Sequence, residues 1–205
     1  MEDFDPEALK ILSYRAKAAL RKRARALRNT IPPEALAERS ARIRARLEGL
    51  PVVAAARRIA LFWPIVRKNE VDLRPLSESL RGRGVEVAYP AIDPATGVMT
   101  FRIPPDPEAM EERGLGFHEP SPEDPETRDL DVIVVPALQV DPRGNRIGYG
   151  AGHYDRTLPR FCPPARSVGV VFDFQVISEV PVTEGDVTID MVVSDERVIE
   201  VEREG

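Results

Sequence analysis

The spacing of apolar residues near the start of the chain predicts two amphipathic helices. Between residues 6 and 28, apolar side chains recur every three or four positions, which places them on one side of an α-helix. They are Leu9, Leu12, Ala16, Leu20, Ala24 and Leu27. A second helix is predicted from about residue 33 to 48, because Pro32 and Pro33 suit the opening positions of a helix and Gly49 ends the pattern.

From residue 58 onward, short runs of β-branched and apolar residues predict strands separated by turns. Residues 58–63 form the first run, and residues 85–89 form the second, which Pro90 ends. The segment 72–81 between them has a helical pattern that stops at Gly82. A strand, a helix and a strand at this spacing predict two parallel strands joined by a right-handed crossover.

The rest of the chain continues the strand pattern and sets the expected fold. Further strands are predicted at residues 98–103, 131–136, 167–172, 187–193 and 198–201. The proline-rich and acidic segment 104–127 is predicted to be a long irregular connection, of the kind that is often functional or mobile. We expect an α/β fold with an open, mostly parallel sheet flanked by helices on both faces, in three α/β/α layers. We expect one domain over residues 1–205, in which residues 1–14 extend the first helix.

Composition excludes several classes of protein. The chain has 205 residues, of which 42% are hydrophobic, and no run approaches 18 apolar residues, so we expect no membrane span and no membrane partner. The start of the chain lacks the basic and then apolar pattern of a signal peptide, so we expect a cytoplasmic location. A single cysteine, Cys162, excludes an internal disulfide, and with two histidines it leaves little material for a zinc site.

Charge is distributed unevenly along the chain, although its net value is −5. Twelve basic residues but only two acids lie between Lys10 and Arg46, while acids dominate from Asp173 onward. Part of this basic segment, Lys17, Arg21, Arg25 and Arg28, forms a ridge on the first helix, where like charges repel unless an anion lies between them. A basic segment raises the possibility of a nucleic-acid partner. Because the arginines are not interleaved with aromatic residues, we expect no binding of nucleic acid.

The segment from residue 131 to 158 carries the clearest chemical motif. A buried strand is followed by turn-forming residues, by three glycines at alternate positions (Gly148, Gly150 and Gly152), and by a helix predicted at about residues 152–161. Glycines let backbone N–H groups approach an anion closely, and a helix N-terminus adds unpaired donors. Arg146 would add a positive charge, and Asp155 would suit a magnesium ion that bridges phosphates. The alternative is a structural turn without a ligand.

Other candidates are isolated side chains in the predicted elements. Glu70 follows the end of a strand, where open α/β sheets bind ligands, although an acid is also common at the start of a helix. Met99 could line a pocket or belong to the core. Asp190 lies inside the apolar run 187–193, and a buried carboxylate there needs a partner or a metal. Three residues could contact a planar ligand or merely pack: Trp63, Phe117 and His118.

Together these motifs resemble the 5-formyltetrahydrofolate cyclo-ligase family, from about residue 15 to 195. The strongest match is the run Pro136-Ala-Leu-Gln-Val-Asp141 followed by Gly144-Asn-Arg-Ile-Gly-Tyr-Gly-Ala-Gly-His-Tyr-Asp-Arg156. Weaker matches are Lys17 with Leu20-Arg21 on the first helix, Asn69-Glu-Val-Asp72, and Ile189-Asp-Met-Val-Val-Ser-Asp195. The resemblance implies an enzyme that uses ATP and Mg²⁺ to close 5-formyltetrahydrofolate to 5,10-methenyltetrahydrofolate, with release of ADP and phosphate.

The resemblance also implies roles for individual residues. For ATP binding it implies Lys17, Arg21, Arg146, Ile147, Gly148, Tyr149, Gly150, Ala151, Gly152, His153 and Tyr154. Arg146 and Tyr154 would be catalytic. Folate would be bound by Phe62, Glu70, Met99 and Tyr154. Asp155 and Asp190 would be associated with magnesium.

Two positions depart from the pattern of many family members. Ala151 stands where many carry lysine, and His153 stands where many carry tyrosine. The first change removes a positive charge near the γ-phosphate, which Arg146 or the first-helix ridge would then have to supply. The second would make activity more sensitive to pH if His153 donates to a ligand. A weakly active relative that binds folate or nucleotide as a sensor therefore remains an alternative. We expect a monomer, with a weak dimer as the other option.

Overall fold

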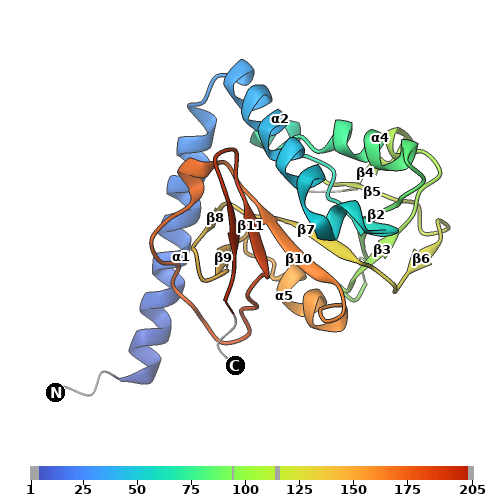
Figure 1. Cartoon of the computed structure of the whole chain (residues 1–205). Helices are drawn as coiled ribbons and strands as arrows, with labels where there is room; N and C mark the ends of the chain where they lie inside the picture. The colour runs from blue at the N-terminus through green and yellow to red at the C-terminus, as the bar shows by residue number, and fades with distance from the viewer. Residues whose placement is uncertain (1–4, 94, 114–115, 203–205) are drawn as a thin grey trace.

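The computed structural model describes residues 5–93, 95–113 and 116–202, and it contains an eight-stranded sheet (Figure 1). The strand order is β12–β11–β10–β7–β1–β2–β3–β6. The strands are β1 (Arg58–Ala60), β2 (Glu86–Ile92), β3 (Met99–Arg102), β6 (Glu126–Thr127), β7 (Val132–Pro136), β10 (Arg166–Val170), β11 (Met191–Val193) and β12 (Val198–Glu200). The five central strands are parallel, and β12, β3 and β6 are added antiparallel, which confirms the expected α/β class.

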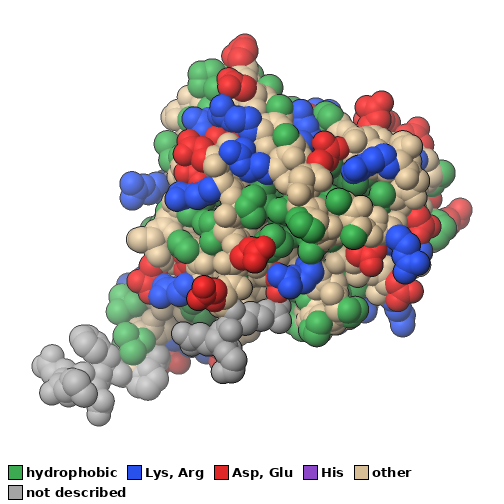
Figure 2. Space-filling model, viewed as in Figure 1, with side chains coloured by type: hydrophobic (Ala, Val, Ile, Leu, Met, Phe, Trp, Pro, Cys, Tyr) green, Lys and Arg blue, Asp and Glu red, His purple; other side chains and the backbone are tan. Residues whose placement is uncertain are grey.

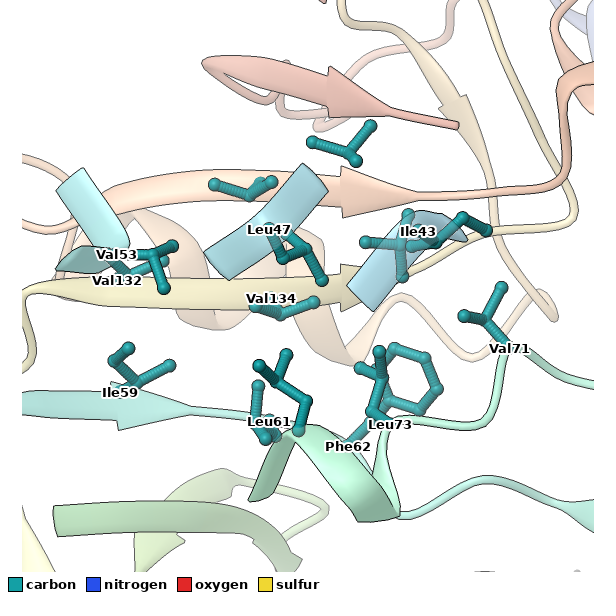
Figure 3. Packing of buried hydrophobic residues seen from close by; sticks show 14 of the residues in the cluster. Ile43, Leu47, Val53, Ile59, Leu61, Phe62, Val71, Leu73, Val132 and Val134 are labelled. Carbon is teal, nitrogen blue, oxygen red and sulfur yellow. The ribbon is translucent and has the colours of Figure 1, made fainter. Parts of the chain in front are cut away.

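Helices cover both faces of this sheet. On one face lie α2 (Pro33–Gly49), α3 (Pro51–Ala54) and α4 (Arg74–Gly82), and on the other lie the shorter α5 (His153–Thr157) and the 3₁₀ turn η3 (Leu158–Arg160) (Figure 1). Neighbouring residues of β7 serve opposite faces, which explains why its apolar run is continuous rather than alternating. Figure 3 shows the first layer, in which Ile43 and Leu47 of α2 lie over the central strands beside Val132 and Val134 of β7.

The first helix, α1 (Pro6–Asn29), corrects the predicted apolar stripe. Leu9 and Leu12 are 47% and 55% exposed, and this part of the helix extends beyond the body of the molecule (Figure 1). Of the predicted stripe, Ala24 is buried and Leu20 packs against its cluster, but α1 also buries Lys17 and Arg28, which are 4% and 3% exposed. Basic residues therefore occupy positions that an ordinary amphipathic helix fills with apolar ones. One of them, Lys17, lines the cavity described below.

The basic residues of α2 are largely paired within the chain. Arg39 and Arg42 contact the buried Asp195, with Nη–Oδ2 distances of 2.5 and 3.4 Å, and Arg46 donates to the carbonyl of Glu196 at 2.9 Å. Figure 2 shows Lys and Arg side chains next to Asp and Glu side chains over the visible face. The uneven charge of the sequence thus becomes a surface of mixed sign, because the acidic C-terminal part packs against the basic N-terminal part.

Several predicted boundaries are wrong for identifiable reasons. β2 runs past Pro90 to Ile92, because beyond Ala88 it pairs only with β3 and a proline is tolerated where one side has no partner strand. The helix predicted at 152–161 ends early, because Pro159 lacks the N–H that an α-helix would need and the chain tightens into η3. Asp190 precedes β11 instead of lying inside a strand.

The remaining short elements lie in the connections. The segment 104–127 contains η2 (Pro107–Ala109) and a small hairpin of β4 (Glu111–Glu112) and β5 (His118–Glu119), with residues 114–115 outside the described residues. A second ribbon pairs β8 (Gln139–Val140) with β9 (Arg146–Ile147), and two more 3₁₀ turns are η1 (Val66–Lys68) and η4 (Asp173–Gln175). Among the helices of the described residues, none has the length and hydrophobicity needed to cross a membrane.

Candidate functional site

A cavity of about 450 Å³ opens at the carboxyl ends of β1, β2 and β7, which is where open parallel sheets bind ligands. Nearly all of the residues singled out from the sequence line it. They are Lys17, Arg21, Phe62, Glu70, Met99, Arg146, Gly148, Tyr149, Gly150, Ala151, Gly152, His153, Tyr154 and Asp155. Residues separated by more than a hundred positions in the sequence therefore meet in a single cavity.

Two of the predicted site residues lie elsewhere. Ile147 is buried in an apolar cluster with Ala24 and Leu138, so its side chain does not reach the cavity. Asp190 is buried between β10 and β11, where its Oδ2 accepts hydrogen bonds from the backbone N–H and the hydroxyl of Ser167, both at 2.8 Å. The buried carboxylate thus has a protein partner, and its position argues against the predicted role as a metal ligand.

The turn that follows β8 is organised around a buried carboxylate. Asp141 accepts hydrogen bonds from the backbone N–H groups of Arg143 and Asn145, both at 3.0 Å, and from Val180 at 2.9 Å. Gly144 completes the turn with φ +80°, and a Cβ there would lie 2.5 Å from the carbonyl oxygen of Ile189. These contacts fix the start of β9 and with it the position of Arg146.

Arg146 is a buried cation of the cavity, as is Lys17. Its Nη1 and Nη2 donate to Oδ1 of Asp155 at 3.0 and 2.9 Å, and the same oxygen accepts from the N–H of Val187 at 3.2 Å. Burial lowers the pKa of Arg146 from its ordinary value, while Asp155 counteracts that shift. The ion pair holds the guanidinium plane in one orientation beside the glycine loop.

The glycine loop follows directly from β9 and needs glycine at two positions. Gly150 has φ +107° and Gly152 has φ +67°, values that residues with a Cβ rarely adopt. A Cβ at Gly152 would also lie 2.9 Å from Nη1 of Arg156. Arg21 donates from Nε to the carbonyl of Gly148 at 3.0 Å, which attaches α1 to the loop.

The helix after this loop is too short to contribute much of a dipole. The residues His153–Thr157 make little more than one turn, whereas the macrodipole arises from many aligned peptide groups. The predicted contribution of a helix N-terminus is therefore small here. Anion binding at this loop would depend on backbone N–H groups and on the cations Lys17, Arg21 and Arg146.

A loop that the sequence reasoning missed also borders the cavity. Lys17 donates to the hydroxyl of Thr183 at 2.6 Å and forms an ion pair with Asp186. The loop is closed on itself, because the N–H of Thr183 donates to Oδ2 of Asp186 at 2.6 Å and Gly185 has φ +85°. The signal in the sequence was the pattern Thr183-x-Gly185-Asp186, which is typical of a capped turn.

The opposite end of the cavity is apolar and aromatic. Phe62 and Met99 are almost fully buried at the cavity wall, and Trp63 lies against His118 with ring centroids 6.3 Å apart. Nδ1 of His118 is buried and has no hydrogen-bond partner among the described residues. Phe117 lines the same end, so the three residues considered for a planar ligand are together. This end offers flat apolar surface with one uncommitted polar atom.

Glu70 and Tyr149 link the two ends. Glu70 accepts a hydrogen bond from the N–H of Ile65 at 2.8 Å on one oxygen and from the hydroxyl of Tyr149 at 2.5 Å on the other. Burial raises the pKa of Glu70 above its ordinary value, and these two donors oppose the shift. Tyr154 is close enough to Glu70 and Arg146 for both to affect its pKa, which burial raises.

In the part of the chain that the structure describes, the side chains around the cavity do not build a metal site by themselves. Within the described residues, no group of three or more His, Cys, Asp or Glu side chains could hold a metal ion. Oδ1 of Asp155 accepts hydrogen bonds from Arg146 and Val187, and Oδ2 has no hydrogen-bond partner among the described residues. Magnesium usually keeps several waters and binds through one or two carboxylates plus phosphate oxygens. The residues therefore fit a magnesium ion that arrives with phosphates, rather than a site built by protein ligands alone.

Comparisons with known proteins agree with the motifs in the sequence. Residues 13–195 match the 5-formyltetrahydrofolate cyclo-ligase family. The chain is 32% identical over 182 residues to the 5-formyltetrahydrofolate cyclo-ligase of Escherichia coli K12, covering 84% of this chain and 97% of that one. It is 33% identical over 199 residues to the enzyme of Mycolicibacterium smegmatis, covering 92% and 98%.

Solved structures show the same fold. The NMR structure of 5,10-methenyltetrahydrofolate synthetase from Aquifex aeolicus superposes with a TM-score of 0.79 at 29% identity, covering 92% of this chain and 94% of that one. The synthetase from Mycoplasma pneumoniae gives a TM-score of 0.70 at 22% identity, covering 87% and 98%, which supports the fold alone.

Proposed function

The chain belongs to the 5-formyltetrahydrofolate cyclo-ligase family, and from this membership we propose how its cavity binds two substrates and joins their chemistry. The protein is an enzyme that converts 5-formyltetrahydrofolate to 5,10-methenyltetrahydrofolate in an ATP-dependent reaction. The proposal concerns which residues bind each substrate, in what order the bonds change, and where magnesium acts.

ATP occupies the end of the cavity that carries the glycine loop and the basic side chains. The loop from Gly148 to Gly152 offers backbone N–H groups, and Lys17, Arg21 and Arg146 supply positive charge. We place the γ-phosphate beside Arg146 and Tyr154, because Tyr154 lies within electrostatic reach of Arg146 and of Glu70 at the folate end. Asp155 would be the residue that holds a magnesium ion bound with ATP, and the ion would supply positive charge against that of the phosphates.

The folate occupies the aromatic end. Phe62 and Met99 contact the pterin ring, and Glu70 accepts hydrogen bonds from its N–H groups. Tyr154 contacts both substrates, since it lies within electrostatic reach of Glu70 on one side and Arg146 on the other. The single observation that carries this proposal is that one cavity holds both sets of residues.

The reaction proceeds in two displacements. The formyl oxygen attacks the γ-phosphorus of ATP, and the bond from that phosphorus to the β,γ-bridging oxygen breaks to release ADP. N10 of the resulting N5-iminium phosphate attacks the former formyl carbon. The bond from that carbon to the phosphate oxygen then breaks, phosphate leaves, and N10 loses its proton to give the methenyl product. The protein contributes position and charge, because phosphoryl transfer requires little covalent chemistry from side chains.

The two departures from the family pattern are compatible with this activity. Nη1 of Arg156 donates to the backbone carbonyl of Ala151 at 2.9 Å, which brings a guanidinium next to the residue where many members have a lysine. Burial and the neighbouring Arg156 lower the pKa of His153 below its ordinary value, which disfavours a positive charge on this side chain in the free protein. We therefore assign the positive charge at the phosphates to Lys17 and the arginines of the cavity.

The proposal is tested by mixing the protein with 5-formyltetrahydrofolate and MgATP and following the near-ultraviolet absorbance of the methenyl product. We expect product formation that requires both ATP and magnesium. Absence of product together with tight folate binding in calorimetry would show a sensor instead of an enzyme. Absence of both product and binding would contradict the residue assignments and the activity.

Replacing Gly150 by alanine is expected to raise the KM for ATP about tenfold. At φ +107° an alanine is strained by roughly 1–2 kcal/mol, so the loop relaxes away from the arrangement that presents its N–H groups. The control is Gly84→Ala, which has a similar φ of +82° and open space around it but lies outside the cavity. Steady-state kinetics of both variants measures the KM for ATP. An equal rise in the two variants would show that the change comes from general destabilisation.

Replacing Glu70 by glutamine is expected to lower kcat/KM for folate by roughly ten- to a hundredfold, because a hydrogen bond to a charged group is lost. The same variant is expected to gain stability relative to the wild type as pH rises. Burial raises the pKa of Glu70 above 4.5, so ionising it costs stability between pH 4.5 and the raised pKa, and that cost persists above it.

Urea unfolding of Glu70→Gln and the wild type at a series of pH values from 4 to 8 measures this trend. Glu123→Gln, at an exposed position, serves as the control. A stability difference that does not change with pH would show that the buried carboxylate costs nothing.

A further inference from the structure

Tyr149 belongs to the glycine loop by sequence but not by the direction of its side chain. It lies between Gly148 and Gly150, where a residue would be expected to serve the nucleotide. Its ring instead packs beside an apolar cluster that includes Leu138 and Ile147, and its hydroxyl lies 2.5 Å from Glu70 at the folate end. The backbone at this position therefore belongs to one substrate's site and the side chain to the other's.

The hydroxyl of Tyr149 is held from two sides. Nη2 of Arg28 donates to it at 2.5 Å, and it donates onward to Oε1 of Glu70 at 2.5 Å. Arg28 is itself buried on α1, so this chain of two hydrogen bonds runs from the first helix through the loop to the carboxylate. A donor fixed by a buried arginine can hold an ionised carboxylate in one rotamer.

Cations surround the ring of Tyr149 as well. Nζ of Lys68 lies 4.6 Å from the ring centroid, and the guanidinium carbons of Arg25 and Arg28 lie 5.4 and 6.0 Å from it. Each distance is within the range for attraction between a cation and an aromatic face. The ring therefore keeps its place through contacts that do not involve the hydroxyl, which makes removal of the hydroxyl alone an informative change.

We propose that Tyr149 is a positioning residue for the folate substrate, which acts by orienting Glu70 and keeping it ionised. This inference rests on the proposed function, since it takes Glu70 as the acceptor for the pterin N–H groups. With Ile65 N–H at 2.8 Å on its other oxygen, Glu70 has a protein donor on each oxygen, and we assign its remaining lone pairs to the ligand. Four side chains with charge or titratable groups act on it or are acted on by it: Arg28, Lys68, Tyr149 and Tyr154.

The test is Tyr149→Phe, assayed for methenyl product with each substrate varied and over a range of pH. We expect the KM for 5-formyltetrahydrofolate to rise about tenfold, and the KM for ATP to stay within about twofold. The acid limb of kcat/KM for folate should move to higher pH. A hydrogen-bond donor favours the ionised carboxylate, so loss of the donor raises the pKa of Glu70. Less of the ionised form is then present at a given pH, and the acid limb moves to higher pH.

Tyr89→Phe is the matched control. The hydroxyl of Tyr89 makes a short buried hydrogen bond with the hydroxyl of Ser77 at 2.5 Å, which the variant loses. Tyr89 does not line the cavity. We expect this control to lower the melting temperature without changing either KM or the pH profile. If Tyr149→Phe behaved in the same way, its role would be structural and the proposal would be wrong.

A double-mutant cycle with Glu70→Gln tests whether Tyr149 acts through Glu70. In the Glu70→Gln background we expect Tyr149→Phe to have almost no further effect on the KM for folate, since the acceptor it serves has lost its charge. Additive effects, or a rise in the KM for ATP with the folate KM unchanged, would make Tyr149 an independent or nucleotide contact. A wild-type protein without product formation would count against the proposed function itself, which separates the two failures.

Discussion

Replacing Arg146 by alanine is expected to lower kcat/KM for ATP by about 10²–10³-fold, the range seen when a donor aimed at developing negative charge is removed. Arg146 is buried, it lines the cavity, and its plane is fixed by Asp155. A preorganised cation at this place costs no rearrangement when charge moves onto the transferred phosphoryl group. The loss should therefore appear mainly in kcat, which single-turnover kinetics measures directly.

Removal of a buried cation also leaves Asp155 without its ion-pair partner, so the alanine variant needs two companions. Arg146→Lys keeps the charge but offers no planar pair of donors, and we expect it to fold and still lose at least about tenfold in kcat. Arg143→Ala removes an exposed arginine from the same turn, and we expect activity within about twofold of the wild type. Full activity in Arg146→Lys would mean that only the sign of the charge matters.

The second large effect is expected for Asp155→Asn, which should lower kcat/KM by about a hundredfold or more. The change keeps the shape and one acceptor oxygen for Val187, but it removes the negative charge that pairs with Arg146 and that would meet magnesium. If Asp155 contacts the metal, the magnesium concentration needed for half-maximal rate must rise in the variant. If it only orients Arg146, kcat falls and the magnesium dependence stays as in the wild type.

Asp190→Asn is the matched control for that measurement. Its carboxylate accepts two hydrogen bonds from Ser167 away from the cavity. We expect a less stable protein with an unchanged magnesium dependence, as determined by metal titration and urea unfolding. A shift in the magnesium requirement would restore the sequence-based assignment of Asp190 as a metal-associated residue.

The central part of the site could be predicted from sequence because its signals are local. Alternating glycines after a buried strand predict a loop with open backbone donors, and an arginine and an aspartate at its two ends complete it. The structure brings Gly148, Gly150, Arg146 and Asp155 to the cavity as expected. Such features follow from backbone conformation over a few residues, which is what a sequence pattern reports well.

Features that depend on tertiary packing were predicted poorly. The face of α1 that meets the protein carries Lys17 and Arg28, and hydrophobic periodicity could not reveal this, because the method assumes that buried positions are apolar. Asp190 in an apolar run predicted a partner or a metal, and only the fold shows that Ser167 is a partner. The Thr183–Asp186 loop is distant in sequence from Lys17, and nothing local to either segment predicts that they pair.

The ion pair between Lys17 and Asp186 has a consequence for turnover. Without nucleotide, the ammonium group of Lys17 is paired with the carboxylate of Asp186 from its own chain. In the proposed binding mode, an incoming phosphate must displace this carboxylate. Asp186 is attached to the same chain, so it is present at Lys17 at a high effective concentration. We expect it to weaken the initial binding of ATP and to pair with Lys17 again when ADP dissociates. Given the proposed role of Lys17 in nucleotide binding, we expect this ion pair to lower the affinity for ATP and to speed the release of ADP.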